Sequence, residues 1–143
     1  MDRNREILII GTYGIDVFYG IIGALEKRDC IAFTTTNQKI AQEYLQNRAF
    51  DAIIINLEPD GKGGVAEIEL LNTIGKSPLQ KKAVCLGVSA HYPNSLPTDK
   101  AEKHLQILAG WLTLPVKPEI LADHILELFE SKNALNVEAK LNS

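Results

Sequence analysis

Five residues in this 143-residue chain follow short apolar runs and carry, between them, the groups most able to do chemistry: Gly11, Thr12, Asn56, Ser89 and Lys117. Two hydroxyls, an amide and an ammonium group can donate hydrogen bonds to a small anion, together with backbone amides of nearby turns. The amide oxygen of an asparagine is a poor nucleophile and carries no charge. The set therefore favours binding, and we expect neither enzymatic activity nor a bound cofactor.

The apolar runs that precede these residues are predicted strands. The stretch from Ala52 to Ile55, extended by Leu57, does not alternate apolar with polar residues, which is typical of a strand that is buried on both faces. The other predicted strands are residues 6–10, 30–33, 83–88 and 111–114.

Helical spacing predicts a helix between each pair of strands and one after the last. The first begins at Ile15, the second follows an N-cap at Asn37, and the third runs from about Val65 until Gly75 and Pro78 end it. The fourth spans about Thr98 to Ala109, and the fifth begins at Pro118, a favoured residue in a first helical turn.

Five strands alternating with five helices predict a parallel sheet that is covered on both faces. All strands of such a sheet end at the same edge, so Gly11, Thr12, Asn56, Ser89 and Lys117 should meet there.

The composition is that of one globular domain, with 45% hydrophobic residues, 23% charged residues and a net charge of −3. No dense run of Lys and Arg indicates nucleic-acid binding, and no apolar run could cross a bilayer. We expect a cytoplasmic protein with a domain at residues 1–131 and a polar, frayed tail or linker at 132–143. Cys30 and Cys85 are expected to be buried thiols.

Several motifs together resemble the receiver domain of bacterial response regulators, the CheY-like family. They are Phe50 to Leu57 (FDAIIINL) closing with Gly64, Ser89-Ala90 after the fourth strand, and Ala109-Gly110 followed by Lys117-Pro118. The resemblance covers about residues 6–130. It implies a flavodoxin-like, doubly wound sheet of strand order 2-1-3-4-5 with five helices.

Members of this family bind magnesium through acidic residues and phosphorylate an aspartate, and here the matching positions differ. The resemblance places Asn56 at the phosphoacceptor position and Gly11 and Thr12 at the acidic pair, while the hydroxyl and the lysine remain as Ser89 and Lys117. Magnesium prefers carboxylate oxygens, so we predict a degenerate pseudo-receiver with no metal site and no phosphorylation at Asn56.

The loop after Asn56 and one position on the fifth strand also depart from the family pattern. Pro59 stands three residues past Asn56 instead of four, and Leu114 replaces an aromatic residue that often moves on activation.

The function expected from the resemblance is signal transduction through a protein partner, with a homodimer also possible. The usual partner surface combines the fourth helix, the fifth strand and the fifth helix, and its candidate residues here are Lys103, His104, Trp111 and Leu114.

Other interpretations stay open. The sheet edge could instead bind a flavin, a quinone or a simple anion, the anion through Lys117, Ser89 and Thr12. Alternatively, Glu58 or Asp60 pairs with Lys117, and Asn56 only bonds to loop backbone. A working phosphoreceiver that uses Asp60 or Asp51 is the third interpretation. His91, His104 and His124 lack the spacing of metal ligands and are expected to be solvated or capping residues.

Overall fold

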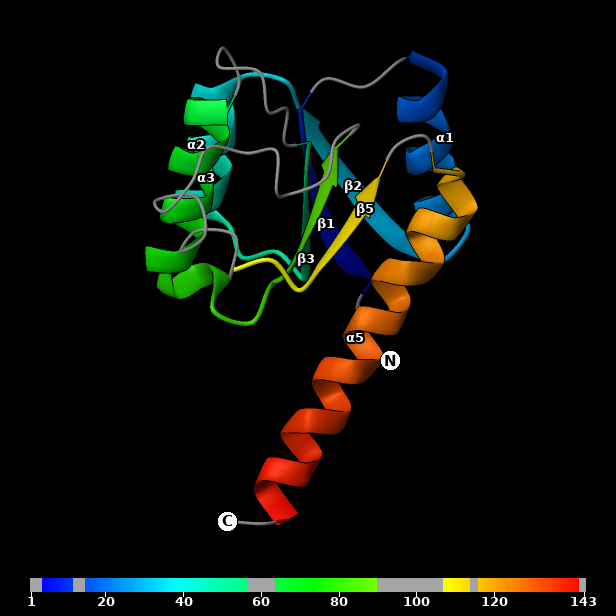
Figure 1. Cartoon of the computed structure of the whole chain (residues 1–143), viewed down its shortest axis with the longest axis vertical. Coiled ribbons are helices and arrows are strands. Elements are labelled where there is room, and N and C mark those ends of the chain that lie inside the picture. Colours follow the sequence, from blue (N-terminus) through cyan, green and yellow to red (C-terminus); the bar gives the residue numbers. More distant parts are fainter. Residues whose placement is uncertain (1–3, 12–14, 57–63, 90–106, 114–115, 142–143) are drawn as a thin grey trace.

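The computed structural model describes residues 4–11, 15–56, 64–89, 107–113 and 116–141. In these residues the first four strands alternate with helices, and a fifth strand and a last helix follow (Figure 1). The elements are β1 (Arg5–Ile10), α1 (Ile15–Glu26), β2 (Cys30–Thr35), α2 (Gln38–Asn47), β3 (Ala52–Asn56), α3 (Gly64–Lys76), the 3₁₀-helix η1 (Pro78–Gln80), β4 (Val84–Ser89), β5 (Gly110–Thr113) and α5 (Pro118–Leu141).

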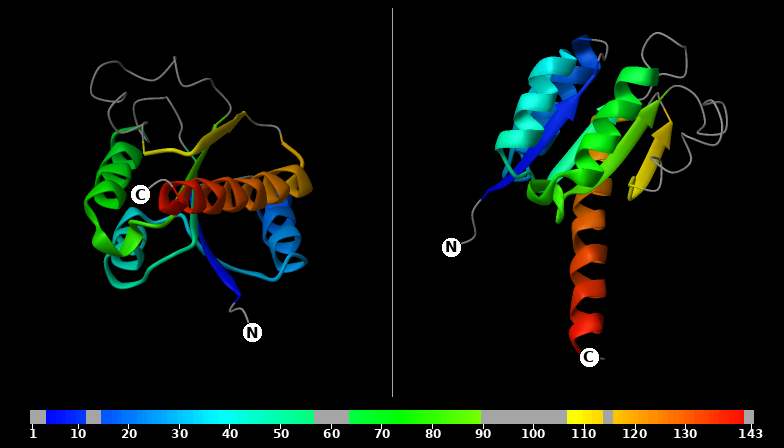
Figure 2. Two further views of the ribbon diagram at one scale, coloured as in Figure 1. Left: turned by 90° about the horizontal axis from the view of Figure 1, so that it is seen from below. Right: turned by 90° about the vertical axis from the view of Figure 1, so that its left-hand side faces the viewer.

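The strands form one five-stranded parallel sheet of order β2-β1-β3-β4-β5. This confirms the predicted strand order and the flavodoxin-like fold class. Parallel neighbours need crossover connections, and α1, α2 and α3 supply the connections between β1 and β4 on both faces of the sheet. Figures 1 and 2 show α2 and α3 on one face and α1 and α5 on the other.

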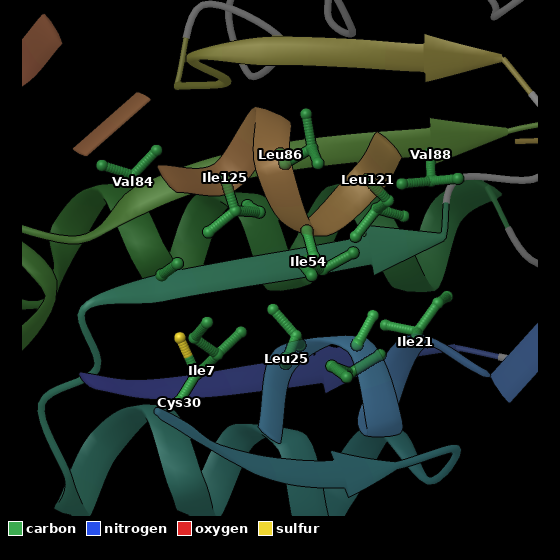
Figure 3. Close-up of a cluster of buried hydrophobic side chains, with 14 of the residues drawn as sticks. Ile7, Ile21, Leu25, Cys30, Ile54, Val84, Leu86, Val88, Leu121 and Ile125 are labelled. Atoms are coloured by element: carbon green, nitrogen blue, oxygen red, sulfur yellow. The ribbon is translucent and has the colours of Figure 1, made fainter. Parts of the chain in front are cut away.

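Each central strand contributes side chains to two core layers, the first between the sheet and α1 and α5, the second between the sheet and α2 and α3. This explains why these strands are unbroken apolar runs in the sequence. Ile7 and Ile9 pack with α1 and α5, as Figure 3 shows for Ile7, while Leu8 and Ile10 pack with α2 and α3. In β3, Ile54 belongs to the first layer and Ile53 and Ile55 to the second. Burying one such side chain stabilises the fold by about 1.5–3 kcal/mol.

Three helix starts were predicted correctly, at Ile15, after Asn37 and at Pro118, and contacts explain the last two. Asn37 caps α2, since its Oδ1 accepts a hydrogen bond of 3.0 Å from the backbone N of Ile40. Pro118 opens α5 and packs against α1, where a Cβ added to Gly20 would lie 2.7 Å from its Cγ.

Several predicted boundaries were wrong. Gly75 does not end α3, which runs one residue further to Lys76; the bare backbone of Gly75 packs against Ile107, whose Cδ1 would lie 2.8 Å from an added Cβ. Residues 107–109 form a turn and a bend, so the predicted fourth helix does not reach Ala109. The rest of that helix, 98–106, lies outside the described residues.

The expectation of a frayed tail was also wrong over residues 132–141, which continue α5 without a break. Lys, Glu, Ala and Leu in this stretch are good helix formers, so its polar character is no stop signal. Figures 1 and 2 show α5 running past the edge of the sheet. The division of the chain at 131 remains a prediction. Within the described ranges, no helix is both long and apolar enough to span a membrane.

Candidate functional site

Asn56 is the last residue of β3 and is 2% exposed. It lies beside Val88 in the parallel register of β3 and β4. Every other residue of β3 is buried and apolar. The strand therefore fixes the amide of Asn56 at the carboxyl edge of the sheet, where open parallel sheets place ligand-binding groups.

Gly11, the residue after β1, presses its backbone against Asn56. Its φ is +124°, a conformation that L-residues rarely adopt, and a Cβ built there would lie 2.5 Å from the Cβ of Asn56. Carbon atoms in normal contact lie about 3.5–4.0 Å apart. No side chain fits at position 11 unless this backbone moves.

The β2–α2 turn holds Gly11 in place. The backbone N of Gly11 donates a hydrogen bond of 3.0 Å to the carbonyl O of Thr35. Thr35 is 8% exposed, and its Oγ1 accepts a bond of 3.0 Å from the backbone N of Asn37. Sequence reasoning missed Thr35; its place at the end of a strand, just before a helix cap, was the available signal.

Ser89 and Lys117 occupy the same edge of the sheet. Ser89 closes β4 and pairs with Thr113 of β5, one residue beyond the Val88 that pairs with Asn56. Lys117 immediately precedes α5, its carbonyl O accepts a bond of 3.1 Å from the backbone N of Leu121, and its side chain is exposed. Thr12 lies outside the described residues.

Together these positions give a site with one buried amide and no carboxylate in its described part. Gly11 offers no side chain, and Asn56 offers a neutral oxygen in place of the charged ligands that magnesium prefers. The residues of this edge that the structure describes do not fit a magnesium ion. Over all the described ranges, no three His, Cys, Asp or Glu side chains are grouped as metal ligands.

Of the four candidate residues of the predicted partner surface, Trp111 alone lies within the described residues. It is half-buried and packs over Gly87 of β4, where an added Cβ would lie 2.9 Å from its Cε3. Its Nε1 is buried and has no hydrogen-bond partner among the described residues. Lys103, His104 and Leu114 lie outside the described residues.

The remaining candidate residues lie elsewhere or have structural roles. Asp51 is at the amino end of β3, where its Oδ2 accepts a bond of 2.7 Å from the backbone N of Glu6, while Glu58, Pro59 and Asp60 are not described. His124 lies 3.8 Å from Oε2 of Glu127, and His91 is not described.

Both cysteines are free and buried, as predicted. Burial raises the pKa of the Cys85 thiol to about 12, and it also raises the pKa of Cys30, where Arg5 opposes the shift.

Solved structures with the same fold include response-regulator receiver domains. One is a receiver domain from Methylobacillus flagellatus (21% identity, TM-score 0.65, 87% of this chain and 98% of that one). Another is a chemotaxis response regulator of Vibrio cholerae (17% identity, TM-score 0.69, the same coverage).

A third similar structure is the receiver domain of a sensor histidine kinase from Pseudomonas aeruginosa, which holds a magnesium ion in its active-site cleft (17% identity, TM-score 0.65, 89% of this chain and 98% of that one). No protein-family model matches the chain, and no curated protein sequence does.

Proposed function

We propose that this chain, which has the fold of CheY-like receiver domains, is a pseudo-receiver. It acts in signal transduction by binding a protein partner and does not depend on phosphorylation. The observation that carries this proposal is the contact between Gly11 and Asn56. A receiver needs carboxylates at these two positions for metal binding and phosphoryl transfer. Here one position is an amide, and the other has no room for any side chain.

The contact separates this chain from a receiver that has lost only its acceptor. A single change of Asn56 to Asp restores a nucleophile, but position 11 still supplies no carboxylate, because a side chain there would meet the Cβ of residue 56 at 2.5 Å. The missing charge and the missing room at position 11 thus both disfavour a bound magnesium ion, and a carboxylate at position 56 alone does not suffice to bind it.

The partner surface proposed here is that of the fourth helix, β5 and α5, with Lys103, His104, Trp111 and Leu114 as candidates. Trp111 supports the surface from beneath, because its ring packs on Gly87 and joins the core between the sheet and α3. We therefore assign Trp111 the role of positioning the surface, while its neighbours make the contacts with the partner.

Beryllium fluoride, a mimic of the phosphoryl group, tests phosphorylation independence. The ¹⁵N-labelled chain is titrated with magnesium and then with beryllium fluoride, beside a magnesium-binding receiver domain as control. We expect no shift of the amides of Gly11, Asn56 and Ser89. Saturable shifts of these amides would refute the proposal.

A pull-down from the source cell tests partner binding. Lys103→Glu with His104→Glu should reduce recovery of the partner, and Lys39→Glu, an exposed lysine on α2, should not. Recovery that is equal for both variants, or that needs acetyl phosphate, counts against the proposal.

A small-anion site is the second candidate function, with Lys117, Ser89 and Thr12 as its residues. The exposed side chain of Lys117 supports it, since that side chain makes no ion pair with another described residue. Titration with sulfate should then shift the amides of Ser89 and Lys117 in the wild type and leave them unshifted in Lys117→Ala. Equal shifts in both proteins would exclude this site.

A further inference from the structure

A cleft of about 840 Å³ opens at the amino edge of the sheet, where no function has been assigned. It lies between the carboxyl end of α3, η1, the start of β4 and the middle of α5. The apolar side chains that line it include Ile74, Ala83, Val84, Cys85, Ile107 and Leu128.

The volume and lining are those of a small-molecule site. Ligand pockets in proteins typically enclose about 300–1,000 Å³ and combine apolar walls with a few polar groups. Val84 is 3% exposed and Cys85 is 2% exposed, so the floor of the cleft is part of the core of β4. A ligand with an apolar body would cover this floor without leaving a polar group unpaired.

The rim of the cleft is basic, although the whole chain is acidic. Lys76, at the end of α3, and Lys81, after η1, both line the cleft and are exposed. Neither makes an ion pair with another described residue, and the described lining contains no Asp or Glu. In a chain of net charge −3, this arrangement favours a ligand with an anionic head.

The cleft is separate from the site at Asn56. Val84 begins β4 and Ser89 ends it, so the two sites lie at opposite ends of one strand, roughly 16 Å apart at about 3.3 Å per residue. We propose that this cleft binds an amphipathic organic anion, its apolar body against β4, Ile107 and Leu128 and its acidic head beside Lys76 and Lys81.

Dodecanoate, kept below its micelle concentration, is the probe, and isothermal titration calorimetry measures its affinity for the whole chain. Dodecyltrimethylammonium has the same apolar chain with the opposite charge and serves as the ligand control. We expect dodecanoate to bind and the cation to bind at least tenfold more weakly. Equal binding of the two, or no binding of dodecanoate at millimolar concentration, overturns the proposal.

Lysine variants test the head group. Lys76→Glu and Lys81→Glu should each weaken dodecanoate binding roughly three- to tenfold, the effect of reversing one partly screened charge. Lys39→Glu, on α2 and not part of the lining, is the matched control and should bind as the wild type does. Affinities that are unchanged in both cleft variants contradict the assigned position of the head.

Two filling variants test the apolar body. Ala109→Trp and Ser131→Trp each place a large ring in the cleft from an exposed lining position, so at least one should fold, as checked by circular dichroism. The folded variant should lose binding at least tenfold; undiminished affinity overturns the proposal.

Methyl NMR locates the bound chain. The methyl groups of Ile74, Ile107 and Leu128 should shift in the wild type, while that of Ile120, which is 53% exposed on α5, should not. Shifts that are confined to Ile120 mean non-specific binding to exposed apolar surface and would refute the site.

Discussion

Replacing Gly11 by alanine adds one carbon atom and tests whether position 11 has room for a side chain. The new Cβ would stand 2.5 Å from the Cβ of Asn56, so the two backbones must separate by about 1 Å to reach normal contact. A residue other than glycine at φ +124° adds backbone strain of about 1–3 kcal/mol. Overpacking in a buried site costs a further 1–3 kcal/mol or so.

We therefore expect Gly11→Ala to lower the free energy of unfolding by about 4 kcal/mol, a large part of the roughly 5–15 kcal/mol of a typical domain. Gly23→Ala in α1 is the matched control, because its added Cβ meets nothing within 4 Å. Alanine is the better helix former, so this control should stabilise the fold by about 0.5–1 kcal/mol.

Urea unfolding followed by far-UV circular dichroism and by the fluorescence of Trp111 measures both variants. A double-mutant cycle with Asn56→Gly isolates the contact, since removing the Cβ of Asn56 removes the overlap but keeps the strain at φ +124°. Gly11→Ala should then cost about 1–3 kcal/mol less in that background. A loss below about 1 kcal/mol in the wild-type background would show that position 11 has room for a side chain.

The other predictions concern stability, thiol chemistry and the altered acceptor. Gln80, 3% exposed, donates bonds of 2.9 and 2.6 Å to the carbonyls of Leu45 and Arg48 and accepts one of 3.2 Å from the N of Phe50. Gln80→Leu should cost about 2–4 kcal/mol in urea unfolding, against under 1 kcal/mol for exposed Gln46→Leu; equal losses would contradict this. Because burial raises the pKa of Cys85 to about 12, a disulfide reagent at pH 8 should modify it only as the chain unfolds. Because the pKa of Cys85 is raised on folding, the neutral thiol contributes fully to the free energy of unfolding below about pH 9, and this contribution is lost as the pH approaches 12. The free energy of unfolding of Cys85→Ser should therefore fall less steeply at alkaline pH. Asn56→Asp, incubated with acetyl phosphate and magnesium, should gain no phosphoryl group by intact mass, because Gly11 supplies no carboxylate to the metal and has no room for a side chain.

The sequence predicted the architecture well because buried parallel strands have a distinctive pattern. Residues 52–55 carry four apolar side chains in a row, and such a run fits only a strand covered on both faces or a buried helix. The side-chain oxygen of Asn37 and the ring of Pro118 act locally, so the starts of α2 and α5 could be predicted from single residues.

Contacts between distant segments could not be predicted in the same way. Gly75 and Gly11 both read as turn residues, yet Gly75 lies inside α3, where its backbone packs against Ile107. Gln80 resembles an ordinary polar loop residue, and only its burial against the end of α2 and the residues that follow α2 reveals its bonds. The residue type at position 11 already shows that a carboxylate is missing there. That position 11 also lacks room for a side chain could not be predicted, because the blocking residue, Asn56, comes from another strand.

Intact mass spectrometry of the unmodified chain after incubation with acetyl phosphate and magnesium tests the central claim most directly. A phosphorylatable receiver domain in the same buffer serves as the positive control. We predict that the control gains a phosphoryl group and that the mass of this chain does not change. A stoichiometric phosphoryl adduct on this chain, whether at Asp51, Asp60 or another carboxylate, would contradict the claim that it signals without phosphorylation.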